Sequence, residues 1–263
     1  MKQKFKWIYL LFIALLFTNS ASAKYPEKTI KIILPFTAGG ATDIAGRLLA
    51  EELSKAFNNP VVVENREGAA GVIGVQATTK AAADGYTLLI AGNTLMTSHK
   101  TLYKNLPYDS LRDLETVSRI SAGSHIIVVK ANSNIKDMKD LLRLARAKPG
   151  GISYGSGGSG TSVHLAAEMF QVQAGVKLLH VPYRGTSLAV TGLMSGDTDL
   201  MFDTTPSAFP KIKSGQLRSF GITSSNRAPD LPDVPTVAEQ GLPNYEVLFW
   251  LGLYAPKGTS PDI

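Results

Sequence analysis

The chain has 263 residues, of which 44% are hydrophobic and 18% are charged. This composition is typical of globular proteins, and the length suits one large domain or two smaller ones. The absence of cysteine excludes disulfides, thiolate catalysis and cysteine-ligated zinc. The formal net charge is +6, but three lysines fall within the first six residues, so the chain from residue 24 onward carries +3 (6 − 3). This mild charge, without a basic stripe interleaved with aromatic residues, does not indicate a nucleic-acid partner.

Residues 1–23 have the pattern of a secretory signal peptide. Lys2, Lys4 and Lys6 form a basic start, an apolar stretch follows, and Ala21-Ser22-Ala23 is a small-residue cleavage site. We therefore predict an exported protein that is cleaved after Ala23 and resides in the periplasm. The alternative is an uncleaved membrane anchor, which the short apolar stretch disfavours.

The mature chain begins with a predicted strand, turn and helix. Residues 30–34 are apolar and β-branched, as is typical of a buried strand. Gly39 and Gly40 follow without side chains, Thr42 or the residue before it is placed to cap a helix, and Asp43 lies in the first helical turn. Apolar residues then recur at helical spacing. A strand, a glycine turn and a helix N-terminus together favour binding of an anion by backbone N–H groups.

A second segment repeats this arrangement, with a glycine- and serine-rich loop between a strand and a helix. It predicts a second anion cradle made by backbone N–H groups and hydroxyls. Its candidate donors are Ser156, Gly157, Ser159, Gly160, Thr161 and Ser162. One alternative is a flexible surface loop, which the Gly and Ser content favours. Another is a dinucleotide-binding G-x-G-x-x-G loop, which is disfavoured because no acidic residue ends the next strand.

Predicted strands and helices alternate along the chain, which favours an α/β fold with mostly parallel sheets flanked by helices. The expected strands are 30–34, 60–63, 86–91, 125–129, 152–154, 178–181, 199–202, 217–223 and 247–255, and the expected helices are one ending at 57 and those over 72–83, 135–147, 161–174, 187–195 and 206–214. The stretch 117–130, divided by small residues at 121–124, and the stretch 247–255 are expected to be crossing strands, the geometry of a hinge. We predict a first lobe over 24–124 and 247–263, and a second lobe over 125–246.

Catalysis and metal binding are not favoured. Ser162, His164 and Asp203 supply the residue types of a triad, but there is no G-x-S-x-G elbow, and His164 points to a different side of the helix from Ser162. The histidines show no metal-ligand spacing. Asp203 ends a predicted strand, where α/β sheets place ligand contacts, or it caps the helix that follows. We predict no catalytic residue, no metal and no cofactor.

Short motifs run through the mature chain in a fixed order. They are PFTAGGATD from Pro35, VVENR from Val62, ADGYTL from Ala83, LPYD from Leu106, GTS from Gly160, HVPYRG from His180, LMFD from Leu200 and LPDVPT from Leu231. With these motifs the chain resembles the periplasmic receptors of tripartite tricarboxylate transporters, also called the Bug family, over nearly its whole mature length.

This resemblance implies a two-lobed type II periplasmic binding protein fold. It implies a receptor that carries a small organic anion, mostly a carboxylate, to a large and a small membrane subunit. The ligand would contact the 36–40 and 159–162 loops, with Asp43 and Asp203 near it. The predicted ligand-binding residues are Phe36, Ala38, Gly39, Gly40, Asp43, Asn93, Ser156, Gly157, Ser159, Gly160, Thr161, Ser162 and Asp203. The family also has a C-terminal helical portion, and the helix-start pattern at 259–262 leads us to expect that the natural protein continues.

Two departures from the family pattern leave the identity of the ligand open. His99-Lys100-Thr101 stand where Asn-Pro is common, and Ala70-Gly71-Val72 stand where Gly-Gly-Asn is common. Because no arginine lies in either loop, we expect backbone N–H groups rather than an ion pair to hold the ligand. We expect a monomer that feeds a transporter. The alternatives are a ligand sensor for a signalling partner and, from a different class, a periplasmic hydrolase.

Overall fold

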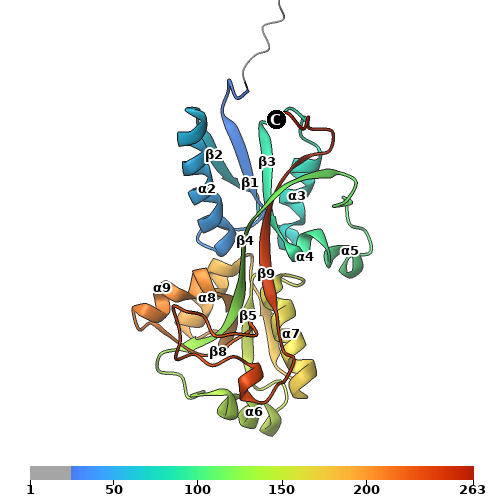
Figure 1. Cartoon of the computed structure of the whole chain (residues 1–263). Helices are drawn as coiled ribbons and strands as arrows, with labels where there is room; N and C mark the ends of the chain where they lie inside the picture. The colour runs from blue at the N-terminus through green and yellow to red at the C-terminus, as the bar shows by residue number, and fades with distance from the viewer. Residues whose placement is uncertain (1–24) are drawn as a thin grey trace, which may run out of the picture.

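The computed structural model describes residues 25–263, so the predicted signal peptide and its cleavage site lie outside the described residues. Figure 1 shows two lobes, one above the other, which two long strands connect. We call them the upper and the lower lobe, as they lie in that view. The connecting strands are β4 (Leu114–Lys130) and β9 (Leu248–Pro256), which run side by side and antiparallel.

The upper lobe is a sheet with helices on both faces. Its own strands are β1 (Ile30–Leu34), β2 (Val61–Asn65) and β3 (Thr87–Gly92), and its helices are α2 (Ala41–Phe57), the short turn η1 (Ala69–Gly71), α3 (Val72–Thr79), α4 (Asn93–Met96) and α5 (His99–Leu102). Strands β2, β1 and β3 pair in parallel, and β9 joins β3 antiparallel. The carboxyl ends of the three parallel strands therefore meet at one edge, which faces the lower lobe.

The lower lobe repeats the design. Its strands are β5 (Ser153–Ser156), β6 (Leu179–Pro182), β7 (Leu200–Thr204) and β8 (Leu217–Ile222), and its helices are α6 (Met138–Ala147), α7 (Ser162–Ala174), α8 (Thr186–Ser195), α9 (Thr205–Lys213) and the short turn η2 (Ala238–Gln240). Strands β6, β5 and β7 are parallel, while β4 pairs antiparallel with β7 and β8. One strand, β4, thus belongs to both sheets.

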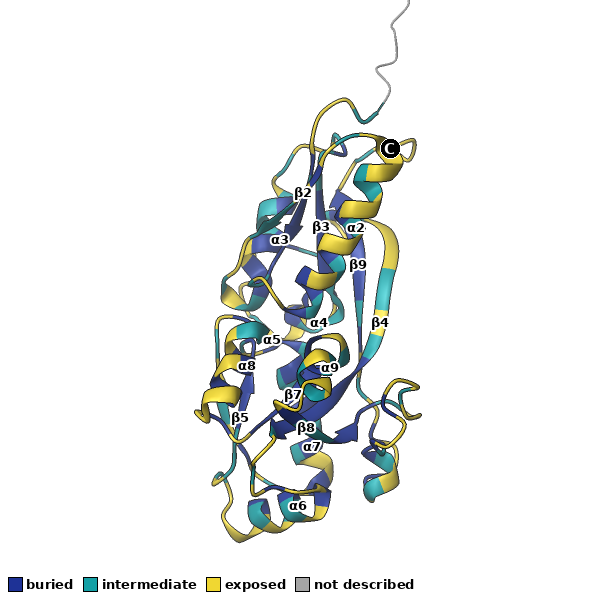
Figure 2. Ribbon diagram, turned by 90° about the vertical axis from the view of Figure 1, so that its left-hand side faces the viewer, coloured by how far each residue is buried: buried dark blue, intermediate teal, exposed yellow. Residues whose placement is uncertain are grey.

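Packing on the two faces of the lower sheet follows the alternation of side chains along a strand. Ile127 and Val129 of β4 belong to one buried cluster with α6 and α7. Ile126 and Val128, their neighbours in the chain, belong to a second cluster with α8 and α9. Figure 2 shows the result, with buried strands in the middle and exposed residues on the outer faces of the helices. Packing on both faces thus positions the strands and the loops that leave their ends.

The α/β, two-lobed fold predicted from the sequence is confirmed. Each expected strand is present with its ends shifted by at most two residues, except that the strand expected over 125–129 is the last part of β4, which begins at Leu114. The division of 117–130 at residues 121–124 is wrong, because β4 is continuous through them. The short helices α4 and α5 were not predicted. Helix α6 begins at Met138 rather than 135, because Asp137 caps it by accepting a hydrogen bond from Asp140 N at 2.9 Å.

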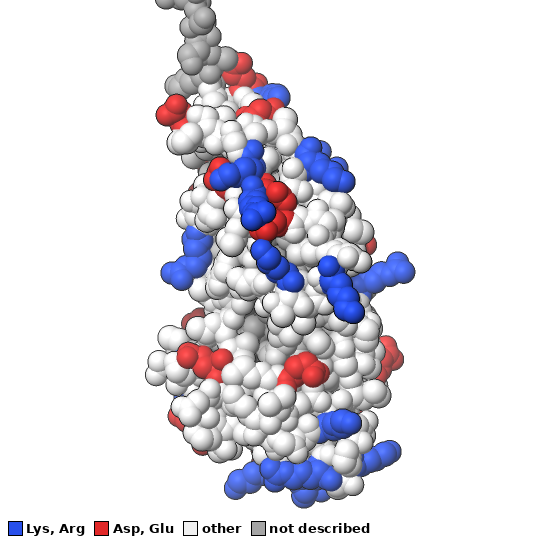
Figure 3. Space-filling view, turned by 90° about the vertical axis from the view of Figure 1, so that its right-hand side faces the viewer, with Lys and Arg blue, Asp and Glu red and all other residues white. Residues whose placement is uncertain are grey.

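Charged groups are scattered over the surface. On the face in Figure 3, Lys and Arg side chains lie over the upper lobe and at the lower tip, with Asp and Glu among them, and no continuous basic band crosses this face. Within residues 25–263, no helix combines the length and the apolar character needed to cross a membrane.

Candidate functional site: the cleft between the lobes

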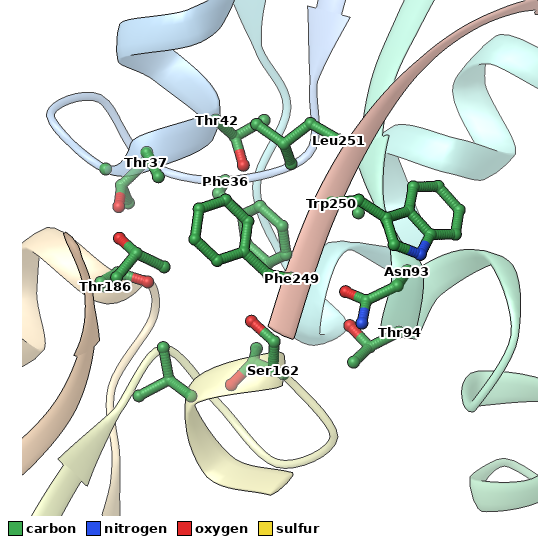
Figure 4. Close-up of a pocket in the computed structure, with 16 residues that line it drawn as sticks. Phe36, Thr37, Thr42, Asn93, Thr94, Ser162, Thr186, Phe249, Trp250 and Leu251 are labelled. Carbon is green, nitrogen blue, oxygen red and sulfur yellow. The ribbon is translucent and has the colours of Figure 1, made fainter. Parts of the chain in front are cut away.

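A cavity of about 50 Å³ lies between the two lobes, beside the strand β9. Both lobes and the crossing strand line it. The lining residues are Phe36, Thr37, Gly40, Ala41, Thr42, Gly92, Asn93, Thr94, Thr161, Ser162, Val163, Thr186, Thr204, Phe249, Trp250 and Leu251. In Figure 4, Thr37 and Thr42 from above and Ser162 and Thr186 from below surround the rings of Phe36 and Phe249.

Five helices begin at this cavity. The lining includes the N-cap or first residue of α2 (Gly40), α4 (Gly92), α7 (Thr161), α8 (Thr186) and α9 (Thr204). The N–H groups of a helix's first turn have no partner inside the helix. Only α7 has a side-chain cap, whereas the other four starts have none. Several backbone donors therefore meet at one small space, an arrangement that favours the binding of an anion.

None of the residues that line the cavity is charged. The other side of the space is apolar and aromatic, with Phe36 from the upper lobe and Phe249, Trp250 and Leu251 from β9. A small anion with a short apolar body fits such a lining, because its charge can face the helix starts while its carbon atoms contact the rings. An ion pair with a lining residue is excluded.

Asp43 fixes the first loop and does not line the cavity. Its side chain is 5% exposed and accepts hydrogen bonds from Gly39 N at 3.0 Å, Arg47 Nε at 2.9 Å and Asn65 Nδ2 at 3.0 Å. Burial raises the pKa of Asp43, but these hydrogen bonds outweigh it, so the pKa lies below its usual range. Asn65 also donates to the carbonyl of Phe36 at 2.9 Å. The Asp43 carboxylate thus stabilises the conformation of the loop from the side that faces away from the cavity.

The capping prediction for this helix is wrong. Neither Thr42 nor the residue before it caps α2; the N-cap is Gly40, which has no side chain. Because Asp43 binds the N–H of Gly39, further back in the loop, the first-turn N–H groups of α2 remain open to the cavity. A glycine N-cap here gives up a side-chain hydrogen bond and leaves room for an external anion.

In the glycine- and serine-rich loop before α7, some hydroxyls are engaged in hydrogen bonds within the protein, and one faces the cavity. Ser156 is fully buried and bonds to His180 Nε2 at 2.6 Å, and Thr161 Oγ1 donates to the carbonyl of Gly158 at 2.8 Å. Thr161 Oγ1 also accepts from His164 N at 3.4 Å, as a helix cap does. Both hydroxyls are thus engaged with other groups of the lower lobe. Ser162 lines the cavity at the first position of α7 and is the hydroxyl best placed to reach an anion.

Asp203 lies behind the cavity, on the other side of β7. Successive residues of a strand face opposite sides, and Thr204 lines the cavity while Asp203 is fully buried. Asp203 Oδ1 accepts from Thr204 N at 2.8 Å, and Oδ2 has no hydrogen-bond partner among the described residues. Burial raises the pKa of Asp203 to about 6, and the hydrogen-bonding groups at the start of α9 offset this only in part. It does not cap α9, whose N-cap is Thr204.

The structure brings five of the thirteen predicted residues into the lining of the cavity. These are Phe36, Gly40, Asn93, Thr161 and Ser162. Gly157 and Ser159 line a neighbouring cavity of about 170 Å³, which shares Phe36 and includes Arg184. The remaining predicted residues, Ala38, Gly39, Asp43, Ser156, Gly160 and Asp203, line neither cavity.

Thr37 lies within the predicted 36–40 contact loop although it was not named as a ligand-binding residue, whereas sequence reasoning missed Thr94, Thr186, Thr204 and the β9 residues. A signal existed for both Thr186 and Thr204, because Thr186 follows strand β6 and opens α8, and Thr204 ends β7 and is the N-cap of α9, as in the predicted loops. The β9 residues 249–251 carry no such signal, because the sequence of an apolar strand that lines a site does not differ from that of a strand buried in the core. No group of three or more His, Asp or Glu side chains within residues 25–263 is arranged to hold a metal ion.

Comparison with known proteins identifies the family. The family model described as "Tripartite tricarboxylate transporter family receptor" matches residues 45–263. A relative from Pseudomonas sp. (strain P51), the "UPF0065 protein in tcbD-tcbE intergenic region", is 42% identical over 257 residues, which cover 95% of this chain and 76% of that protein.

Two solved structures from Rhodopseudomonas palustris are also similar. Rpa4515 with adipate is 32% identical with a TM-score of 0.88, and MatC (Rpa3494) with bound malate is 29% identical with a TM-score of 0.85. Each alignment covers 90% of this chain and 80% of the other. The chain therefore belongs to the family of tripartite tricarboxylate transporter receptors.

Proposed function

We propose that this protein is a periplasmic receptor that captures a small carboxylate between its two lobes and delivers it, unchanged, to a tripartite tricarboxylate-type membrane transporter. The observation that carries the proposal is the meeting of five helix N-termini at a cavity without charged residues. Related structures hold adipate and malate, so acids with two carboxylates are the first ligands to test. The receptor would act as a monomer, with lobes as predicted over 24–124 with 247–263, and over 125–246.

Helix starts can supply the affinity without an arginine. Each favourable helix N-terminus contributes about 0.3–1 kcal/mol, and up to about 2 kcal/mol when partly buried. A hydrogen bond to a charged group adds roughly 1.5–3 kcal/mol. Three or four such contacts sum to roughly 8 kcal/mol, the free energy of a micromolar complex, and because association has its own cost, most of the five helix starts would have to contribute. Binding would then select for the shape and charge of a carboxylate.

The identity of the ligand is the decisive measurement. Native mass spectrometry of protein purified from the periplasm without refolding should detect a bound carboxylate. Calorimetric titration with the same acid should give micromolar or tighter affinity, and the acid should be recovered intact afterwards. Turnover of the acid would favour the hydrolase alternative, and the absence of affinity for any carboxylate would refute the proposal.

Closure of the lobes on the ligand is the expected motion. Residues of both lobes line the cavity, so only the closed state brings all five helix starts to the ligand. Small-angle X-ray scattering should show a smaller radius of gyration when the ligand saturates the protein. An unchanged radius would mean a preclosed receptor or a site on one lobe.

Export requires processing of the chain. We expect signal peptidase to cleave after Ala23, because the basic start, the apolar stretch and the small residues at 21–23 meet its requirements. N-terminal sequencing of the periplasmic protein should therefore begin at Lys24. Soluble periplasmic protein that still starts at Met1 would contradict this.

A further inference from the structure

Two histidines, His164 and His180, form hydrogen bonds with the loop that precedes α7 at the cavity. We call residues 156–161 the cradle loop. Near its end, Gly160 N donates a hydrogen bond to His164 Nδ1 at 3.2 Å. At its start, Ser156 Oγ bonds to His180 Nε2 at 2.6 Å and accepts from Gly158 N at 3.1 Å. The shape of the loop, and with it the start of α7, therefore depends on these two imidazoles.

The hydrogen bond from Gly160 fixes the state of His164. Because a backbone N–H can only donate, Nδ1 must be an unprotonated acceptor, so the neutral ring carries its proton on Nε2. That nitrogen lies 3.8 Å from Glu168 Oε1. A proton added to Nδ1 would place two N–H groups against each other and break the bond to Gly160. His180 lacks this constraint, because a hydroxyl such as that of Ser156 can either donate or accept.

Other titratable groups face the pair. The two imidazole rings lie 4.3 Å apart, and Tyr154 of β5 stacks on His180 at 4.9 Å. Tyr154 donates its hydroxyl to Glu168 of α7. Across the cleft, the fully buried ring of His99 in α5 lies against Gly160, where an added Cβ would come within 3.3 Å of His99 Nε2. Glu168 is thus the one acidic side chain that these contacts place beside His164.

At neutral pH both rings are uncharged. Burial lowers the pKa of His164, and Glu168 offsets part of this effect. Burial, together with the neighbouring His164, lowers the pKa of His180 to about 4. The native protein therefore resists protonation of both rings, and His164 takes up its proton only when the pH falls below the ordinary value of a histidine, about 6.5.

We propose that His164 is a positioning residue for the cradle loop, and that a proton on its Nδ1 frees the Gly160 N–H, loosens the loop and weakens ligand capture in acid. The histidine does not line either cavity, so it acts through the loop and not by touching the ligand. The link to ligand capture rests on the proposed function, whereas the state of the loop does not.

Hydrogen exchange of the Gly160 amide tests the loop without any ligand. In the wild type, protection relative to the intrinsic exchange rate should fall at least tenfold between pH 7.5 and pH 4.5. His164→Asn should keep its protection at both pH values, because the asparagine Oδ1 can take the place of Nδ1 as an acceptor but does not titrate. His180→Gln is the matched control, and it should retain the acid-induced loss because His164 is still present.

Two exchange results would overturn the inference. One is undiminished protection of Gly160 in the wild type down to pH 4.5. The other is an equal loss in the wild type and in His164→Asn, which would assign the titration to another group, such as His99.

Binding is the second readout, with malate and adipate as probes. The affinities of the wild type and His164→Asn should agree within threefold at pH 7.5. At pH 4.5 the asparagine variant should bind at least fivefold more tightly than the wild type. Equal affinities at that pH would show that the state of the loop does not affect ligand binding. Because both proteins are titrated with the same acid at each pH, protonation of the acid affects both affinities equally and cancels in the ratio of the variant's affinity to that of the wild type. If neither protein binds either acid, the choice of ligand in the proposed function fails, while the exchange result still decides the role of His164.

Discussion

Gly185→Ala is expected to keep the lobes apart and to lower ligand affinity at least a hundredfold, about 2.7 kcal/mol. Gly185 precedes α8 in the lower lobe and has a φ of 137°. A Cβ there would lie 2.1 Å from Thr37 Oγ1 of the upper lobe. Thr37 Oγ1 also hydrogen-bonds to Ser187 Oγ at 2.8 Å, so this is a point where the lobes touch. The added methyl group therefore blocks closure, and the open receptor loses the helix starts of one lobe.

The conformation of Gly185 requires a control for backbone strain. Its φ is one that residues other than glycine adopt at a cost of about 1–3 kcal/mol, so the variant also loses stability. Gly215→Ala is a suitable comparison, because Gly215 has a φ of 71° but an added Cβ there would meet nothing within 4 Å. It should unfold at a lower temperature and still bind the ligand.

Scattering separates blocked closure from a general loss of structure. Gly185→Ala should keep the larger, ligand-free radius of gyration at ligand concentrations that close the wild type. The double variant Thr37→Gly with Gly185→Ala removes the atoms that clash and should regain part of the closure. Normal closure and affinity in Gly185→Ala would show that this contact does not control the lobes.

Local patterns along the chain predict four of the five helices, all but α4, but they mark only two of the helix starts as anion cradles. The strand, glycine turn and helix around Gly40, and the similar succession around Thr161, are short-range features that depend on spacing and on glycine. The starts at Gly92, Thr186 and Thr204 carry weaker signals of the same kind. What places all five at one cavity is the pairing of β3 with β9 and of β4 with both β9 and β7. These contacts are distant in sequence and leave no local pattern.

The polar residues that fell outside the cavity lining show a second limit. Ser156 was expected to contact the ligand as a hydroxyl donor of its loop, Asp203 because it ends a strand, and Asp43 because the family resemblance places it near the ligand. Each is at least 95% buried and bonds to its own loop or to the next residue. For Ser156 and Asp203, which end strands, a shift of one residue would turn the side chain to the other face of the sheet, and a single sequence does not fix that register.

The way the anion is held is tested most directly by Gly40→Val. Gly40 is the N-cap of α2, lines the cavity and has an extended backbone, with φ −86° and ψ 172°. Valine adopts that conformation readily, so the substitution should not strain the turn and its effect should be steric. A Cβ at Gly40 would meet only Thr186 Cβ at 3.8 Å, an ordinary contact, and the two methyl groups of valine would reach further into the cavity. We expect affinity to fall tenfold or more, about 1.4 kcal/mol, with an unchanged melting temperature.

The controls for Gly40→Val distinguish the effect of an added side chain at the start of α2 from the loss of an ion pair. Gly40→Ala adds only the Cβ and should bind nearly as well as the wild type. Arg66→Ala and Arg184→Ala should change affinity little, because neither arginine lines the cavity where the helices begin. Arg184 is the sharper control, since it lines the neighbouring cavity and is the basic residue best placed to reach a ligand that extends there. If calorimetry shows normal binding by Gly40→Val and none by Arg184→Ala, a side-chain ion pair holds the carboxylate, and the five uncharged helix starts do not.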